Sequence, residues 1–182
     1  MLDIHVRAAR LNEAEIICRL VHESMASYCR DSGIPLDYIE ATQEEIDAVR
    51  DAISSGVVFV ALSEHEEILG TCRLYIRPSR DVASALPAKM KKLSSRVAYF
   101  ARFSVWDEWR GKGIGNFLLM YCEGIARKTA CSHIFLHTAR TNTGMVDYYE
   151  SRGFSLVSTD TGRGYARGLF CKYLAKDSSH TR

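Results

Sequence analysis

The residues with the clearest chemical signal lie between positions 103 and 115, in the run Phe-Ser-Val-Trp-Asp-Glu-Trp-Arg-Gly-Lys-Gly-Ile-Gly. A strand pattern ends at Val105, glycines follow at every second position from 111 to 115, and an amphipathic helix pattern then begins. Helix N-termini carry unpaired N–H groups and a positive dipole end, and glycine lets the backbone approach an anion closely. Together with the charges of Arg110 and Lys112, this segment predicts a phosphate-binding loop.

The same loop could also be a plain glycine-rich turn with surface charges, or one of two better-known phosphate loops. A Walker A loop requires GxxxxGK[ST], which this sequence lacks. A dinucleotide fingerprint requires GxGxxG early in a βαβ unit, whereas here the spacing is GxGxG and lies late in the chain.

A second segment, residues 142–154, makes the pattern more specific because it reads Asn-Thr-Gly-Met-Val-Asp-Tyr-Tyr-Glu-Ser-Arg-Gly-Phe. The chain resembles the GCN5-related N-acetyltransferase (GNAT) superfamily, whose Q/R-x-x-G-x-G/A and N…Y-E-x-x-G-F segments match residues 110–115 and 142–154. The resemblance implies that acetyl-CoA or another acyl-CoA is the co-substrate. The residues implied to bind it are Phe103, Val105, Arg110, Gly111, Lys112, Gly113, Ile114, Gly115, Asn142 and Tyr149.

The resemblance also implies an N-acyltransferase in which a primary amine attacks the thioester directly, in a ternary complex without an acyl-enzyme. A backbone N–H at Phe103 or Val105 would meet the oxyanion, and Tyr149 would protonate the departing thiolate. Asn142 would contact the pantetheine or acyl region. Asn142 and Tyr149 are seven residues apart, so a helix would place them on one face. The alternatives are an N-cap role for Asn142 and simple packing for Tyr149.

The sequence identifies the general base that deprotonates the amine less clearly than the other catalytic groups. Many relatives use a carboxylate on the strand before the loop, but residues 99–105 contain none. His137, at the end of the next expected strand, is the candidate catalytic base, acting directly or through water. The alternatives are a purely structural histidine, a base role for Asp107 or Glu108, and capture of the small free-amine fraction of the acceptor.

The hydrophobic patterning predicts one mixed α/β domain over residues 1–182, with residues 176–182 as a frayed tail. The family resemblance implies a central, mostly antiparallel twisted sheet flanked by helices. Strands are expected at residues 4–8, 57–62, 68–76, 99–105, 133–138, 154–158 and 169–174. Helices are expected after an Asn12 cap, after a Thr42/Glu45 capping box, and over residues 88–93, 113–128 and 144–151. A loop that can include one turn of helix is expected over residues 28–41.

Composition narrows the function class. The chain is 47% hydrophobic and 25% charged with a net charge of +2, which gives no reason to expect nucleic acid binding. No apolar run approaches the roughly 18 residues that cross a bilayer, and residues 1–10 carry charges, so a cytoplasmic protein without a membrane partner is expected.

The six cysteines are scattered without a CxxC pair, which argues against a metal site and for reduced thiols, with Cys122 and Cys171 in the core.

The sequence leaves three alternatives to an acetyltransferase open, the first of them also an acyl transfer. Residues 78–92 and 102–105 are similar to a branch of the same fold that takes long acyl chains from acyl carrier protein, which Lys89, Lys91, Lys92 and Arg96 would dock. A catalytically silent acyl-CoA-binding module and a plain protein-interaction domain are the second and third hypotheses that compete with an acetyltransferase.

The acceptor is expected to be a small-molecule amine or a protein amine. The resemblance implies that its identity is set by the segment after the first helix, residues 28–41, by the insert at residues 78–96, and by the last hairpin around residues 160–167. A homodimer is suggested by analogy alone.

Overall fold

The computed structural model describes residues 3–83, 86 and 93–174 of the 182-residue chain. Its strands are β1 (His5–Ala8), β2 (Val58–Leu62), β3 (Ile68–Pro78), β4 (Arg96–Val105), β5 (His133–Ala139), β6 (Ser155–Asp160) and β7 (Arg167–Tyr173). Its α-helices are α1 (Ala14–Ser32), α2 (Ile46–Ser54), α3 (Arg80–Ala83), α4 (Ile114–Lys128) and α5 (Thr143–Glu150). Short 3-10 helices are η1 (Leu11–Glu13), η2 (Leu36–Tyr38), η3 (Glu40–Gln43) and η4 (Asp107–Trp109). The expected tail 176–182 and the expected basic helix, Leu93 apart, lie outside the described residues.

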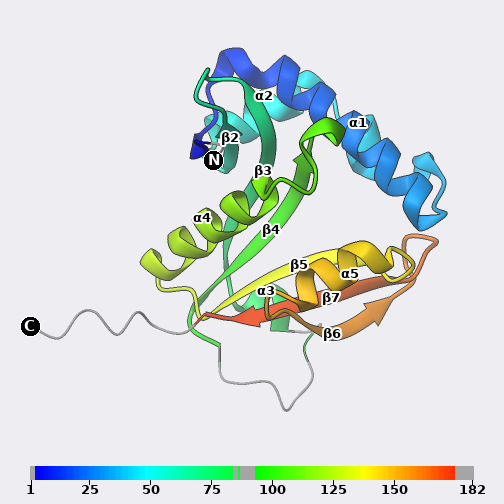
Figure 1. The fold of residues 1–182 in the computed structure, drawn as a ribbon. Coiled ribbons are helices and arrows are strands. Elements are labelled where there is room, and N and C mark those ends of the chain that lie inside the picture. Colours follow the sequence, from blue (N-terminus) through cyan, green and yellow to red (C-terminus); the bar gives the residue numbers. More distant parts are fainter. Residues whose placement is uncertain (1–2, 84–85, 87–92, 175–182) are drawn as a thin grey trace, which may run out of the picture. The chain divides into compact units, whose positions relative to one another are not determined.

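The strands of the described residues form a mixed seven-stranded sheet in the order β1-β2-β3-β4-β5-β7-β6 (Figure 1). The β1–β2, β2–β3, β5–β7 and β6–β7 pairs are antiparallel, whereas β4 and β5 run parallel, with Ala98 opposite Ile134. This mixed, mostly antiparallel sheet with flanking helices confirms the predicted fold class.

The chain groups into two compact units. One consists of Met1–Leu74 and Ala101–Tyr121, and the other of Tyr75–Phe100 and Cys122–Arg182. The first unit holds β1, β2, α1, α2 and the glycine-rich loop, and the second holds β5, β6, β7 and α5. The covalent chain passes between the units within β3, β4 and α4.

In the first unit, α1 packs against α2 and η3, and its buried face includes Ile17, Leu20 and Val21 (Figure 1). The helix continues to Ser32 and ends at Gly33, which takes the left-handed conformation with φ 67°. The expected loop over residues 28–41 is therefore wrong in its first part. Apolar periodicity in the last two turns of α1 is weak, because their buried positions are serine and cysteine.

Two expected helix caps are wrong. Asn12 lies inside η1, and the residue preceding α1 is Glu13. Thr42 lies inside η3, where its hydroxyl donates to the carbonyl of Ile39 at 2.7 Å, so it caps no α-helix. The second helix begins at Ile46 after Glu45, whose side chain forms no capping bond. Short polar side chains bond to nearby carbonyls in turns as readily as to helix N-termini, and the sequence pattern does not separate these two uses.

Glu44, in the link from η3 to α2, contacts three other elements of the first unit. Its carboxylate accepts two hydrogen bonds from Arg73 of β3, at 2.8 and 2.7 Å, and both side chains are buried, at 9% and 6% exposure. Arg102 of β4 lies 3.4 Å from the same carboxylate. The Glu44 backbone carbonyl contacts His22 Nε2 at 2.8 Å and Cys18 Sγ at 3.2 Å, both from α1. One residue thus holds the α1–α2 link against β3 and β4.

Gly70 of β3 sets how closely α4 and β4 approach within the first unit. A Cβ atom there would lie 3.0 Å from the carbonyl oxygen of Ser104 and 3.2 Å from side-chain atoms of Ile114 and Leu118. The first turns of α4 are therefore packed directly on the backbone of β3.

The second unit carries its own hydrophobic cluster. Buried Val97, Phe135, Leu169 and Cys171 pack with the partly buried side chains of Val82, Leu86, Leu93, Tyr99 and Val157. The helix α5 lies along β5 and is followed by Gly153 at φ 84°, which confirms the expected left-handed stop.

All six cysteines are buried thiols outside any disulfide, which confirms the core positions expected for Cys122 and Cys171. Burial raises the pKa of the Cys171 thiol to about 12, so it packs as a neutral side chain. In the part of the chain that the structure describes, no helix combines the length and apolar character needed to cross a membrane.

We expect Glu44→Gln to lower the free energy of unfolding by about 3 to 5 kcal/mol, because it leaves the buried Arg73 guanidinium without its counter-charge. Urea denaturation followed by circular dichroism measures the change. The matched control is Asp47→Asn, whose ion pair with Arg50 is exposed and whose loss costs less than about 1 kcal/mol. A Glu44→Gln protein as stable as this control would contradict the role assigned to the ion pair.

Candidate functional site

The glycine-rich loop lies in the first unit between β4 and α4, as the sequence predicts. Trp106 leaves the strand and its indole N–H donates to the carbonyl of Ile68 at 2.9 Å, after which η4 turns the chain toward the loop. Gly111 and Gly113 have φ values of 73° and 88°, and no atom lies within 4 Å of the position a Cβ would take at either residue. Glycine is needed there for the left-handed backbone, and the space above the loop is open.

The backbone N–H groups of the glycine-rich loop are the donors that an anion could meet. Hydrogen bonds within the described residues use the N–H groups of Trp109 and Arg110 before the loop, and of Asn116 and Phe117 after it. Among those same residues, the N–H groups from Gly111 to Gly115 have no acceptor. Consecutive unpaired N–H groups at a helix N-terminus form an anion-binding concavity.

The two cations of the loop already have partners in the first unit. Arg110 donates to Ser27 Oγ at 2.7 Å and Ser24 Oγ at 3.3 Å on α1, and pairs with Asp107 at 2.9 Å. Lys112 Nζ lies 4.4 Å from the centre of the Trp109 ring. Arg110 therefore anchors the loop to α1, while exposed Lys112 is held by a cation–π contact that a phosphate can supplement.

The strand segment before the loop has an unusual backbone at Arg102, where φ is 51°. Left-handed conformations are costly for residues with a Cβ atom, and they persist only where neighbouring contacts fix them. The ion pair of Arg102 with Glu44 is such a contact. Phe103 and Val105, the expected oxyanion donors, follow directly on β4.

The second unit holds the remaining predicted residues. Asn142 is the N-cap of α5, and its Oδ1 accepts a hydrogen bond from the backbone N–H of Met145 at 3.0 Å. Tyr149 is buried, at 4% exposure, with its ring packed edge-on against Tyr148 and Phe154 at centroid distances of 5.3 and 5.6 Å. Asn142 is also buried, at 5% exposure, but it precedes the helix rather than lying within it.

His137 lies on β5 and is half-buried. Its Nδ1 is 2.8 Å from the hydroxyl of Tyr99 on β4. Burial lowers the pKa of His137 to about 4, and the nearby charge of Arg167 lowers it further than Asp160 raises it. The imidazole is therefore neutral at pH 7, and it accepts a proton at Nε2 only in the tautomer whose Nδ1–H donates to Tyr99.

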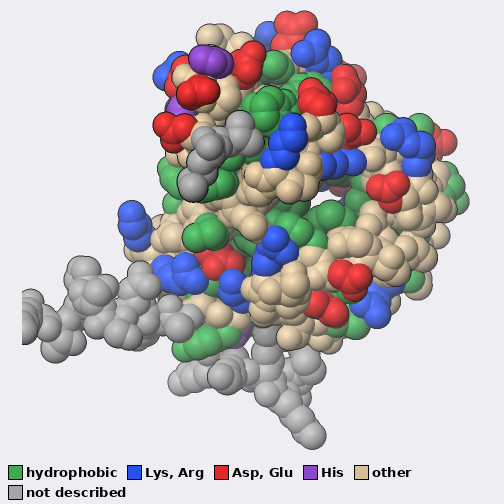
Figure 2. All heavy atoms as spheres, viewed as in Figure 1, with side chains coloured by type: hydrophobic (Ala, Val, Ile, Leu, Met, Phe, Trp, Pro, Cys, Tyr) green, Lys and Arg blue, Asp and Glu red, His purple; other side chains and the backbone are tan. Residues whose placement is uncertain are grey.

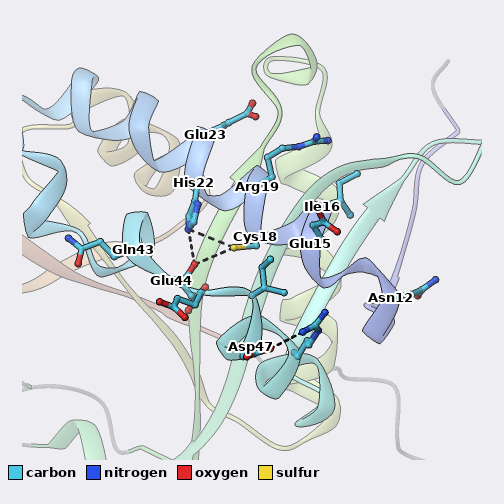
Figure 3. A pocket seen from close by; sticks show the side chains of 13 residues that line it. Asn12, Glu15, Ile16, Cys18, Arg19, His22, Glu23, Gln43, Glu44 and Asp47 are labelled. Atoms are coloured by element: carbon cyan, nitrogen blue, oxygen red, sulfur yellow. Dashed lines mark hydrogen bonds and ion pairs between the residues drawn. The ribbon is translucent and has the colours of Figure 1, made fainter.

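A hollow of about 880 Å³ lies in the first unit between α1, η3 and α2 (Figure 3). His22 and Cys18 meet Glu44 there, and the surrounding rim carries side chains of both charges, such as Glu15 and Arg19. Acidic and basic side chains are likewise intermixed on the molecular face shown in Figure 2. Within the described ranges, no group of three or more histidine, cysteine or acidic side chains is arranged to hold a metal ion.

Comparison with known protein families identifies the family to which this chain belongs. The model of the Acetyltransferase (GNAT) family matches residues 21–154, which include α4, the glycine-rich loop and α5. The chain belongs to the GNAT acetyltransferase family. The family resemblance inferred from residues 110–115 and 142–154 is thereby confirmed.

Two curated proteins are similar to this GNAT chain over part of their length. The chloroplastic GCN5-related N-acetyltransferase 4 of Arabidopsis thaliana is 30% identical over 83 residues, covering 44% of this chain and 28% of the relative. N-alpha-acetyltransferase 60 of Xenopus tropicalis is 24% identical over 144 residues, covering 76% of this chain and 57% of the relative. The matches thus span less than two thirds of either relative.

Solved structures share the fold over almost the entire chain. An acetyltransferase of the GNAT family from Streptococcus agalactiae has a TM-score of 0.76 at 19% identity, covering 95% of this chain and 96% of that one. The PaiA N-acetyltransferase of Thermoplasma acidophilum, in complex with coenzyme A, has a TM-score of 0.71 at 20% identity, covering 94% of this chain and 99% of that one.

Sequence reasoning did not find Glu44, Arg102 or Tyr99. The Thr42/Glu45 pair drew attention as a capping box, and Glu44 between them carried no local signal. Arg102 gave no sign of its left-handed backbone, because such a conformation in a strand is set by its ion pair rather than by residue type. Tyr99 was assigned only to a strand. Side chains alternate between the two faces of a strand, so aligning the polar residues of the two neighbouring strands could have placed Tyr99 near His137.

We expect the His137 ring to titrate near pH 4 in the folded chain, against 6.5 for an unperturbed histidine. Because the folded-state pKa is lowered, the stability tied to neutral His137 is complete above pH 6.5 and is lost as pH falls toward 4. NMR of the imidazole C–H signals gives the pKa, and urea melts at pH 7 and 5 give the stability. Wild type should lose more stability between these pH values than His137→Asn; a ring that titrates near 6.5 would contradict the assignment.

Proposed function

We propose that this GNAT chain transfers an acetyl group from acetyl-CoA to a primary amine by direct attack in a ternary complex. The observation that carries the proposal is the run of N–H groups from Gly111 to Gly115, without acceptors among the described residues and opening into space at the N-terminus of α4. Such a run is suited to the diphosphate of coenzyme A, with Lys112 adding charge. Carrier-bound acyl groups have no such nucleotide diphosphate, which favours coenzyme A as the donor.

The catalytic roles follow from the chemistry of thioester aminolysis. We assign the backbone N–H of Phe103 or Val105 to the oxyanion and Tyr149 to protonation of the thiolate. A thiol has a pKa near 8.5 and a phenol near 10, so the phenol gives up its proton only as charge develops on sulfur. Asn142 shapes the start of α5 and is proposed to contact the pantetheine.

His137 is proposed to take the proton that an ammonium acceptor must lose before it attacks. Its lowered pKa keeps the ring neutral at pH 7 with a lone pair available, and the same lowering makes it a weaker base than an ordinary histidine. A ring with a pKa near 4 holds that proton only briefly, and it therefore passes the proton onward to water.

For the acceptor, the relatives suggest an amine at a peptide N-terminus as the first class to test. One curated relative is named an N-alpha-acetyltransferase, which supports a protein or peptide amine, and the PaiA structure supports use of coenzyme A. Small-molecule amines are the second class.

We expect acetyl-CoA to stabilise the folded chain by about 2.7 kcal/mol at 100 times its Kd, in a thermal-shift titration with free CoA and longer acyl-CoAs in parallel. Lys112→Glu should weaken this stabilisation, because it places a negative charge beside the bound phosphates. The matched control is Lys128→Glu, which makes the same charge change at the exposed far end of the same helix. Equal loss of stabilisation in both variants, or no stabilisation of wild type by any CoA, would overturn the proposed phosphate site.

We expect Tyr149→Phe to lower kcat by about 10²- to 10⁴-fold while leaving stabilisation by acetyl-CoA intact, because a phenyl ring fills the same space without a proton to donate. Release of free CoA thiol measures turnover. Tyr148→Phe, one residue earlier on α5, is the control. A Tyr149→Phe enzyme with wild-type kcat would remove the general-acid assignment.

A further inference from the structure

The ion cluster around Glu44 contains more positive than negative charge. Arg73 takes both carboxylate oxygens at 2.8 and 2.7 Å, which is the bidentate geometry that neutralises a carboxylate fully. Arg102 reaches the same carboxylate only at 3.4 Å, through Nε. Two guanidinium groups thus share one carboxylate, and the charge of Arg102 is left in excess.

The contacts of Arg102 leave its positive charge only partly paired. Its Nε is buried and forms no hydrogen bond with the described residues, whereas the side chain as a whole keeps 26% of its surface exposed. Its backbone is held at φ 51°, a conformation that costs free energy for any residue but glycine. A strained backbone and a charge that one shared carboxylate does not balance make the exposed part of the Arg102 side chain a candidate ligand-binding position.

The place of Arg102 in the chain relates it to the reaction. It directly precedes Phe103, which is a candidate donor to the thioester oxygen, and adjacent Cα atoms are about 3.8 Å apart. Arg102 and the backbone N–H proposed to meet the thioester oxygen therefore belong to neighbouring residues of one strand.

We propose that Arg102 is a specificity-determining residue that binds a carboxylate of the acceptor, so that the substrate class is a primary amine carrying a carboxylate group near its nitrogen. This inference rests on the proposed function and narrows it. The carboxylate belongs either to a free amino acid or to an acidic first residue of a peptide, and both offer Arg102 the planar acceptor that a guanidinium pairs with.

The test compares matched acceptors on wild type and on Arg102→Gln. One arm uses alanine against alaninamide, which differ in the α-carboxylate. The other arm uses C-terminally amidated tetrapeptides beginning Asp-Ala against Asn-Ala, which differ in the side-chain carboxylate. We expect wild type to prefer the acid in one arm, which identifies the source, and Arg102→Gln to lower kcat/KM for that acid by roughly 10- to 100-fold, mainly through KM. Its kcat/KM for the neutral counterpart should fall much less, so the ratio of acid to neutral turnover is the readout.

Two further variants separate recognition from structure. Arg102→Lys keeps the charge but not the planar fork, and should restore part of the preference. Arg50→Gln removes an exposed cation from α2 in the same unit and should leave the preference intact. Equal use of acid and neutral acceptor by wild type, or an Arg102→Gln loss that is the same for both, would overturn the inference.

Binding provides the second readout. The same four acceptors are titrated against the CoA-bound protein by thermal shift, and the preferred acid should stabilise wild type more than Arg102→Gln. If CoA binds and no acceptor stabilises the chain in an Arg102-dependent way, the inference fails while the CoA site stands. If CoA itself does not bind, the proposed function fails first, and the inference falls with it.

Discussion

The buried ion pair between Glu44 and Arg73 is the constraint on which the first unit depends. Breaking a buried pair of a carboxylate and a guanidinium lowers the stability strongly, because it leaves one buried charge without its counter-charge. The α1–α2 link is thereby fixed against β3 through the side chain of Glu44, and against α1 through its backbone carbonyl, which meets His22 and Cys18. The position of Arg102 on β4 follows from this arrangement.

Three residues with positive φ lie on the stretch of the first unit that runs from β4 into α4. Arg102, Gly111 and Gly113 all take left-handed φ values. The two glycines do so at little cost, and they turn successive N–H groups toward open space. At Arg102 the cost is offset by an ion pair. Arg110 then ties the loop to α1 through Ser24 and Ser27, so the anion-binding backbone is held rigidly before any ligand arrives.

In the second unit, the surroundings of His137 in the sheet lower its pKa. His137 is kept neutral by burial and by Arg167, whose own ion pair with Asp160 spans β7 and β6. Its contact with Tyr99 crosses from β5 to β4, so the tautomer of the ring is linked to the orientation of a phenol. Next to β5, α5 begins after its N-cap residue Asn142 and buries Tyr149.

The sequence by itself determined the features that depend on near neighbours. The glycine-rich loop, the amphipathic α4, the Asn142 cap and the Gly153 stop are all set by residue type and short spacing, and so was the family. Tertiary structure alone decided the pairs Glu44–Arg73 and Tyr99–His137, which are 29 and 38 residues apart. It also decided the left-handed Arg102 and the true ends of α1 and α2, against the caps expected at Asn12 and Thr42. Local propensities differ by about 1 kcal/mol or less, whereas a buried charge without its partner costs several, so the distant contact determines the outcome.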